Sequence, residues 1–291
     1  MSEEPSFVLR GVRKSFGSFT ALADVDLRIA AGEQVALIGP SGAGKSTLIG
    51  LLNGTLQPSA GQVRVLGQDL AQLAPGPRRR LQSQLGTIYQ QFHLVANLRV
   101  IHNVNAGHLG RWSTLRALVS LLWPLEVGTA AAALLRVGIA DKLYQRTGLL
   151  SGGEQQRVAL ARVLVQDPRA ILADEPIASL DPERGRELMD LLRELGAQSG
   201  KTLVASLHSV EYARSHFGRI VGLRGGRVCF DGPPAALTPA LVEDIYRIER
   251  PEPDGSKAAQ HTPEREPGRV GAAAGSAQGS ALPEVVEVVD R

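Results

Sequence analysis

A glycine-rich loop occupies residues 39–47 and reads Gly39-Pro40-Ser41-Gly42-Ala43-Gly44-Lys45-Ser46-Thr47. The loop fits the pattern G-x-x-x-x-G-K-[ST] of a phosphate-binding P-loop. An apolar run at residues 34–38 predicts a buried strand before it, and residues 46–52 predict a helix after it. Because a P-loop requires this strand–loop–helix setting, the sequence predicts a nucleotide-binding α/β core.

The residue types of this loop explain the expected chemistry. Glycines let the backbone fold tightly, so that its N–H groups point at phosphate oxygens. The N-terminus of the following helix adds a partial positive charge, and Lys45 adds a full one. The Ser46 hydroxyl can ligate Mg²⁺. We therefore expect residues 39–47 to bind a nucleotide together with Mg²⁺.

A second glycine-containing loop, at residues 150–157, reads Leu-Ser-Gly-Gly-Glu-Gln-Gln-Arg. Ser151 is expected to cap a helix, and Glu154 three residues later completes a capping box. Alone, this pattern fits an ordinary capped helix equally well. Together with the P-loop, Ser151, Gly152 and Gly153 resemble the signature motif of the ATP-binding cassette (ABC) ATPases.

Residues 170–175 form an apolar run that ends in two carboxylates, Asp174 and Glu175. They resemble the Walker B motif of the ABC ATPases. The resemblance implies that Asp174 holds Mg²⁺ through water and that Glu175 polarises the attacking water. Two acids that only cap a strand are a weaker alternative, because the residues before them are otherwise apolar.

Four more positions match motifs of the resembling family. Asp181 lies where the family places its D-loop, and His208 resembles the switch histidine that contacts the γ-phosphate. His208 follows an apolar run, and α/β proteins bind ligands where such strands end. Gln90 matches the catalytic, Mg²⁺-binding glutamine of the Q-loop, with Gln91 as the adjacent alternative. Phe16 matches the aromatic residue that stacks on adenine, with burial in the core as the alternative.

Composition bounds the class of protein. A net charge of +3 over 291 residues is too small to indicate nucleic-acid binding. The single cysteine, Cys229, excludes an internal disulfide and a CxxC metal site, which fits a reducing cytosol. The acidic N-terminus does not resemble a secretory signal, and no apolar run reaches the roughly 20 residues of a membrane helix. Any membrane role is therefore expected to depend on a partner.

We expect an α/β fold, a P-loop NTPase of the ABC type, across residues 7–248. Residues 7 to about 85 show strand patterns, and residues from about 92 to 150 show short helical periodicities. The resemblance implies that these regions are the antiparallel β subdomain and the helical subdomain of the family. Alternating helices and strands then end in a hairpin around Gly225-Gly226 and a helix at residues 239–248.

The motifs occur once each, so the chain carries one nucleotide-binding unit. In the resembling family, such a unit supplies half of each catalytic site. The resemblance therefore implies a homodimer in which Ser151 and Gly153 of a second copy complete the ATP site. ATP-driven closure would then move integral membrane permease subunits, with a periplasmic substrate-binding protein in the same complex. This places the chain at the cytoplasmic face of the cell inner membrane as a peripheral subunit.

Residues 7–248 resemble the ATPase subunits of phosphonate importers most closely. The points of resemblance are residues 90–95, 107–116, 137–142 and 206–208, while Tyr89 and Glu154 depart from the common residues. The alternatives are an ABC ATPase for phosphate, an amino acid or another polar solute, or for lipoprotein release. DNA-repair and translation ATPases of this class need two cassettes, a coiled-coil insertion or zinc-binding cysteines, and drug exporters usually carry fused membrane helices. The sequence shows none of these features, which argues against both classes.

An insertion at residues 107–124 carries apolar residues at helical spacing. They are Trp112, Leu115, Leu118, Leu122 and Trp123. The spacing predicts that much of this set shares one helical face. We expect part of the face to pack internally and the rest to contact the permease.

Residues 251–291 are rich in Pro, Gly, Ala, Ser and Glu and contain no aromatic residue, which predicts a disordered tail. An apolar cluster at 285–289 could be a short binding segment, but chance is the better explanation. Removing residues 252–291 is expected to leave the melting temperature and the ATPase rate unchanged, because such a segment cannot add to a core. Thermal unfolding and phosphate release of the truncated chain test this, and a large fall in melting temperature would contradict it.

Overall fold

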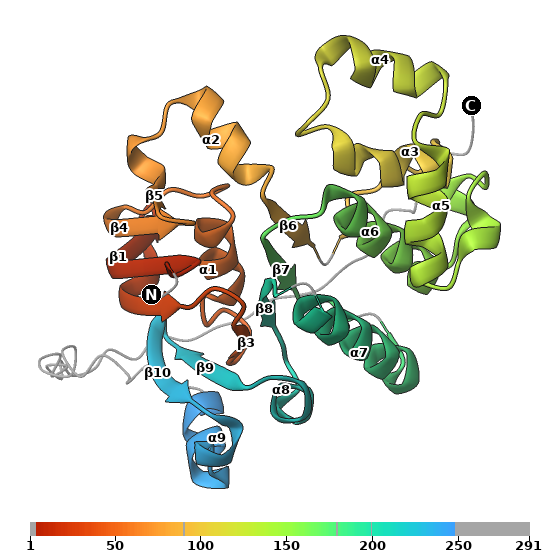
Figure 1. The fold of residues 1–291 in the computed structure, drawn as a ribbon. Helices are drawn as coiled ribbons and strands as arrows, with labels where there is room; N and C mark the ends of the chain where they lie inside the picture. The colour runs from red at the N-terminus through yellow and green to blue at the C-terminus, as the bar shows by residue number, and fades with distance from the viewer. Residues whose placement is uncertain (1–3, 90, 179, 199, 248–291) are drawn as a thin grey trace, which may run out of the picture. The chain divides into compact units, whose positions relative to one another are not determined.

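The computed structural model describes residues 4–247 except residues 90, 179 and 199, so the predicted tail at 251–291 lies outside the described residues. The strands are β1 (Phe7–Phe16), β2 (Phe19–Ile29), β3 (Gln34–Ile38), β4 (Ala60–Val65), β5 (Gln68–Asp69), β6 (Leu85–Ile88), β7 (Ala170–Asp174), β8 (Thr202–Ser206), β9 (Arg219–Arg224) and β10 (Arg227–Gly232). The α-helices are α1 (Lys45–Leu52), α2 (Pro75–Gln82), α3 (Val100–Asn105), α4 (Thr114–Leu122), α5 (Val127–Arg136), α6 (Gly152–Gln166), α7 (Pro182–Gln198), α8 (Val210–His216) and α9 (Pro239–Tyr246). Figure 1 shows their arrangement.

The central sheet has six strands in the order β10-β9-β3-β8-β7-β6. The pairs β9–β3, β3–β8, β8–β7 and β7–β6 are parallel, and β10 returns antiparallel to β9 as the predicted hairpin. Strand β3, which precedes the P-loop, lies between β8 and β9, so its residues are buried on both faces. The predicted α/β fold is confirmed.

Alternation along β3 directs its side chains into two cores. Val35 and Leu37 belong to the core that includes α1 and the antiparallel sheet. Ala36 and Ile38 belong to the other core, which helices α7, α8 and α9 cover through their contacts with β8, β3 and β9. One five-residue strand thus joins both halves of the fold, because successive side chains of a strand point to opposite faces.

A second sheet, with strand order β2-β1-β4-β5, is antiparallel throughout. Helix α1 contacts β2 and β4 on this sheet and β7 and β8 on the central sheet. The predicted antiparallel subdomain therefore packs directly on the helix that follows the P-loop.

The helical subdomain contains α3, α4 and α5, within the predicted range of about 92–150. Helix α6 packs against α3 and α5 as well as against β6, so it joins this subdomain to the central sheet. On α5, Ala130, Ala133 and Leu134 are buried. Figure 1 shows the helical subdomain to one side of the sheets, with α4 far from them.

No single described helix has the length and apolar composition to cross a membrane. Helices α4 and α5 meet those criteria only as a pair, which is bent by 75° at the break between them.

Close packing of Gly107 against α6 fixes the helical subdomain. Gly107 lies in the short 3₁₀ helix η2 (Ala106–His108), where a Cβ would collide with the Arg162 carbonyl and lie 2.8 Å from the Gln166 backbone nitrogen. Gly107→Ala is therefore expected to lower the free energy of unfolding by about 1–3 kcal/mol, as overpacking typically does. Gly128→Ala is the control, because a Cβ there meets open space on α5, and it is expected to add about 0.4–1 kcal/mol. Urea unfolding measures both, and an unchanged stability for Gly107→Ala would contradict the contact.

Candidate active site

The P-loop lies between β3 and α1, as the sequence predicts. Its glycines are required by conformation and by close neighbours. Gly44 caps α1 with φ 102°, and a Cβ there would lie 2.7 Å from the Ala21 carbonyl oxygen. Gly39 has φ 146°, and a Cβ there would collide with the Leu223 carbonyl. The loop can therefore hold this shape against β2 and β9 only with glycine at both positions.

Lys45 begins α1 and is only 4% exposed. Its Nζ donates to the carbonyl oxygens of Gly39, at 2.8 Å, and of Pro40, at 3.1 Å. Burial lowers the pKa of Lys45, while the nearby charges of Glu175 and Asp174 act in the opposite direction. The cation is thus held by the loop itself beside two acids, at the position where a phosphate would meet it.

Asp174, at the end of β7, is fixed by two hydroxyl groups. Ser46 Oγ donates to Asp174 Oδ1 at 3.0 Å, and Ser206 Oγ donates to the same oxygen at 2.7 Å. Ser206 is fully buried and also accepts the Glu175 backbone N–H at 2.8 Å. Sequence reasoning missed Ser206, although a hydroxyl within the apolar run before His208 is a signal that could have found it.

Glu175 and His208 meet at the ends of the neighbouring parallel strands β7 and β8. His208 Nε2 lies 2.6 Å from Glu175 Oε1. Glu175 has φ 49°, a left-handed conformation that is uncommon outside glycine. Such backbone outliers cluster at functional sites, and this one lies at the residue whose carboxylate contacts His208. The structure therefore brings together two residues that lie 33 positions apart in the chain.

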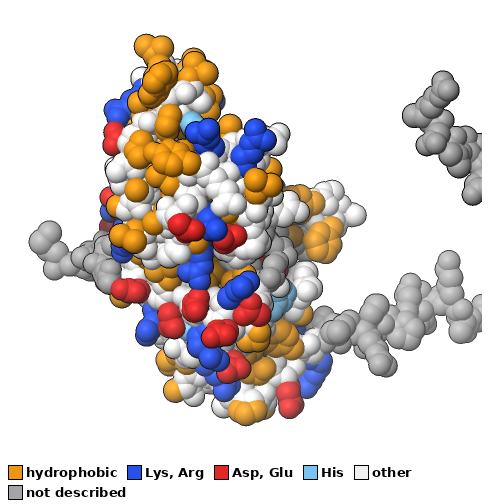
Figure 2. Space-filling model, turned by 90° about the vertical axis from the view of Figure 1, so that its right-hand side faces the viewer, with side chains coloured by type: hydrophobic (Ala, Val, Ile, Leu, Met, Phe, Trp, Pro, Cys, Tyr) orange, Lys and Arg blue, Asp and Glu red, His pale blue; other side chains and the backbone are white. Residues whose placement is uncertain are grey.

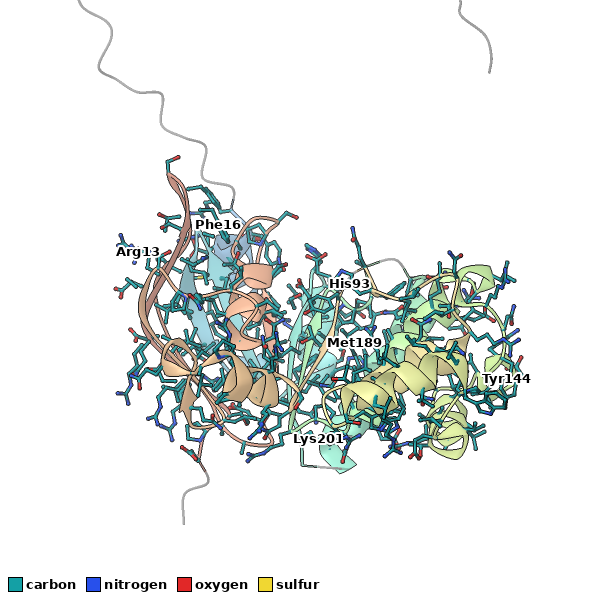
Figure 3. The ribbon with its side chains drawn as sticks, turned by 90° about the horizontal axis from the view of Figure 1, so that it is seen from above. Arg13, Phe16, His93, Tyr144, Met189 and Lys201 are labelled. Carbon is teal, nitrogen blue, oxygen red and sulfur yellow. The ribbon has the colours of Figure 1, made fainter. Side chains whose placement is uncertain are left out.

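A cavity of about 220 Å³ is lined by P-loop residues and by Glu175. Phe19 also lines it and is 61% exposed. Phe16, in the same β1–β2 hairpin, is 46% exposed, so the alternative that it is a core residue is wrong. Lys14 Nζ lies 4.8 Å from the centre of the Phe16 ring. Figure 3 labels Phe16. Stacking of Phe16 on adenine stays a prediction, and Phe19 is a second candidate that the sequence did not single out.

The oxygen donors of Ser46 and Asp174 suit Mg²⁺, which binds proteins through few carboxylates and completes its shell with water and phosphate. The described part of the chain contains no cluster of three or more His, Cys, Asp or Glu residues that could hold a metal. An ion at Ser46 and Asp174 would therefore depend on the bound nucleotide for its other ligands. The third predicted ligand, Gln90, lies outside the described residues.

Ser151 caps α6 through the predicted capping box. Its backbone N–H and its Oγ donate to Glu154 Oε2 at 2.8 and 2.9 Å, and Glu154 N–H donates to Ser151 Oγ at 3.3 Å. These bonds lower the pKa of Glu154. Ser151 and Gly152 are exposed, and the lining of the P-loop cavity does not include the signature residues at 151–153. The structure therefore does not bring the signature and the P-loop together within the described part of one chain.

Asp181 precedes α7 and is also exposed. Its Oδ1 accepts the Arg184 backbone N–H at 3.0 Å, and this bond is the main reason for its lowered pKa. The carboxylate is therefore kept ionised at the start of the helix. Its predicted role toward nucleotide stays a prediction.

The fold and the site together define a P-loop nucleoside triphosphatase. Residues 22–178 match the ABC transporter family, and the chain belongs to that family; its cassette binds ATP. The chain is 45% identical over 248 residues to Phosphonates import ATP-binding protein PhnC 1 of Pseudomonas aeruginosa, covering 84% of this chain and 93% of that protein. It is 46% identical over 263 residues to Phosphonates import ATP-binding protein PhnC of Anaeromyxobacter dehalogenans, covering 90% of this chain but only 52% of that protein.

Solved structures are similar over most of the fold. The ATP-binding cassette MJ0796, solved as a dimer in a post-hydrolysis state bound to ADP and Pi, is 30% identical with a TM-score of 0.67. The match covers 78% of this chain and 98% of that chain. The protein cbiO1 of Clostridium perfringens, part of the ABC transporter complex cbiONQ, is 26% identical with a TM-score of 0.70, covering 83% and 94% of the two chains. These likenesses confirm the predicted ABC ATPase fold.

Lys45→Ala is expected to weaken ATP binding about 10- to 100-fold, since a hydrogen bond to a charged group contributes about 1.5–3 kcal/mol. Lys201→Ala is the control, because Lys201 pairs with Asp167 rather than with the P-loop. Titration calorimetry measures both affinities. Unchanged ATP affinity for Lys45→Ala would contradict a phosphate-binding role.

Proposed function

We propose that this chain is the ATP-hydrolysing subunit of an ABC importer that takes up phosphonates across the cytoplasmic membrane. The ATPase assignment rests on Lys45 and Glu175, which line the P-loop cavity, and on Asp174 and His208, which bond to the lining residues Ser46 and Glu175. The identity of 45% across 93% of a phosphonate import protein supports the substrate class. The chain itself provides no phosphonate chemistry, because its site is built for nucleotide.

In this mechanism the P-loop N–H groups and Lys45 bind the β- and γ-phosphates and neutralise their charge. Ser46, Asp174 and Gln90 would hold Mg²⁺, which supplies further charge neutralisation at the phosphates. Glu175 orients the attacking water and accepts its proton, and His208, 2.6 Å from Glu175, contacts the γ-phosphate from the end of β8. Catalysis is therefore mostly positioning and electrostatics.

A second copy of the chain completes each ATP site. The signature residues are exposed at the start of α6, away from the P-loop cavity. In a head-to-tail pair, the Ser151 hydroxyl and the Gly153 N–H of one copy would contact the γ-phosphate held by the other, with Asp181 at the same interface. The dimeric form of the similar cassette MJ0796 supports this arrangement.

A segment of the permease is proposed to occupy a cavity of about 360 Å³ between the central sheet and the helical subdomain. Thr87 and Tyr89 line it from the β6 side, and His93 and Arg162 line it from the helical side (Figure 3 labels His93). Arg162, on α6, donates to the carbonyls of His93 and Phe92 at 2.9 and 3.0 Å. The segment that follows Gln90 is thus tied to the helix that begins at the signature. A permease seated there would sense closure of the dimer.

This assembly places the chain at the cytoplasmic face of the inner membrane, with a periplasmic substrate-binding protein reached only through the permease. Uptake by the reconstituted complex tests the substrate class. We expect the complex to transport a phosphonate but not phosphate or amino acids. Transport of another polar solute would leave the ATPase assignment intact and overturn phosphonate import.

Glu175→Gln is expected to lower the ATP hydrolysis rate by about 10²- to 10⁴-fold, the usual contribution of a general base, while ATP affinity stays near normal. Glu211→Gln, on the exposed surface of α8, is the matched control. Steady-state phosphate release and nucleotide binding are measured for both variants. Near-normal turnover in Glu175→Gln would remove Glu175 from the mechanism.

A further inference from the structure

Helix α4 attaches to the protein by its polar side. The His102 ring Nδ1 lies 3.1 Å from the Ser120 carbonyl oxygen, and Asn105 Nδ2 donates to the Leu125 carbonyl just after the helix. Ser120 is 7% exposed and is the buried residue of α4. Arg116 pairs with Glu126 at 2.6 Å and lies over the Trp112 ring at 5.1 Å. These contacts hold the helix with its polar side toward the protein. In an ordinary surface helix, the apolar side faces the core.

The apolar side chains of α4 point outward. The sequence predicts that part of this face packs internally, and that expectation is wrong for Leu115, Leu118, Leu122 and Trp123, which are exposed. The exposed fractions of the apolar side chains are 73% for Leu115, 58% for Leu118, 43% for Val119, 54% for Leu121, 87% for Leu122 and 75% for Trp123. Figure 2 shows hydrophobic side chains gathered at the top of the molecule, where Figure 1 places α4. A contiguous apolar surface of this kind marks an interaction site.

The width of this surface limits what can cover it. At about 100° per residue, the five apolar positions inside α4 span roughly 160° of the helix circumference, and Trp123 extends the apolar surface past the end of the helix. A folded partner would need a groove that encloses nearly half of the helix. The acyl chains of a bilayer can cover the same width of the helix without any groove.

Charge around α4 favours an anionic surface. The helical subdomain, residues 92–150, contains two acids, Glu126 and Asp141, and six basic residues, Arg99, Arg111, Arg116, Arg136, Lys142 and Arg146. Trp112 and Trp123 flank the helix at its two ends, and tryptophan prefers the boundary between headgroups and acyl chains. Leucines and tryptophan on one face with arginine nearby are typical of a helix that lies in a membrane interface.

We propose that α4 lies in the interfacial layer of an anionic bilayer, with Leu118, Leu122 and Trp123 among the acyl chains and the neighbouring arginines at the headgroups. The adjoining apolar helix α5 has no such role, because its buried Ala130, Ala133 and Leu134 pack against the protein. The insertion at residues 107–124, which contains α4, also borders the cavity proposed for the permease, because Gly110 packs against Ser83 and both residues line that cavity. The contact with lipid does not depend on which substrate the transporter carries.

The chain offers a direct probe of this contact, because its two tryptophans are the two that flank α4. The full chain would be mixed with vesicles of phosphatidylglycerol and phosphatidylcholine, and with vesicles of phosphatidylcholine alone. Trp112→Phe leaves Trp123 as the reporter, and Trp123→Phe reports on Trp112 in turn. The expected result is a blue shift of Trp123 emission with anionic vesicles, quenching by brominated acyl chains, and weakening at high salt.

Leu122→Asp is expected to lower partitioning onto anionic vesicles at least about 10-fold, as a charge replaces an acyl contact. Leu135→Asp is the matched control, because Leu135 is 70% exposed on α5, and its partitioning should stay within about twofold of the parent chain. ATP binding by each variant confirms that it is folded.

Three results would overturn the proposal. The first is an unchanged Trp123 spectrum with vesicles in a chain that binds ATP. The second is equal partitioning of Leu122→Asp and the parent chain. The third is burial of Trp123 only with detergent-solubilised permease or only by self-association, which would assign the surface to a protein partner.

Discussion

A buried ammonium group is the constraint on which this structure depends. Lys45 is almost completely removed from solvent, yet its Nζ bonds only two P-loop carbonyls in the described structure. Burying a charge is costly unless other charges compensate for it, and Asp174 and Glu175 act in that direction. The strand ends that carry these acids, the glycines of the loop and the hydroxyl of Ser206 are all arranged around one cation. A triphosphate completes that arrangement, which explains why the site binds nucleotide.

The signature residues lie apart from this arrangement. The P-loop and Glu175 line one cavity and His208 bonds to Glu175, whereas Ser151 and Gly152 are exposed at the capped start of α6. The Glu154 carboxylate accepts the Ser151 N–H and Oγ at this helix start, and the exposed Ser151 and Gly152 are the residues proposed to face a phosphate held by another copy. Arg162 connects that helix to the segment after the Q-loop. In the proposed dimer, this contact would link nucleotide binding at the interface to the cavity proposed for the permease.

The helical subdomain separates internal packing from external contact. Helix α5 uses its small residues to pack against α3 and α6, and Gly107 brings η2 against α6. Helix α4 is instead attached to α3 by polar contacts from His102 and Asn105, and its leucines remain exposed. Two neighbouring helices of similar composition therefore have different roles because their contacts differ.

The sequence alone determined the fold class, the P-loop, the capping box at Ser151 and the adjacent acids Asp174 and Glu175, because these depend on residue types at fixed local spacing. It could not reveal the bonds of Ser206 or the outward face of α4. Both depend on which residues the sheet order and helix packing bring together across long stretches of chain. Helical spacing shows that apolar residues share a face, but only tertiary contacts decide whether that face points inward.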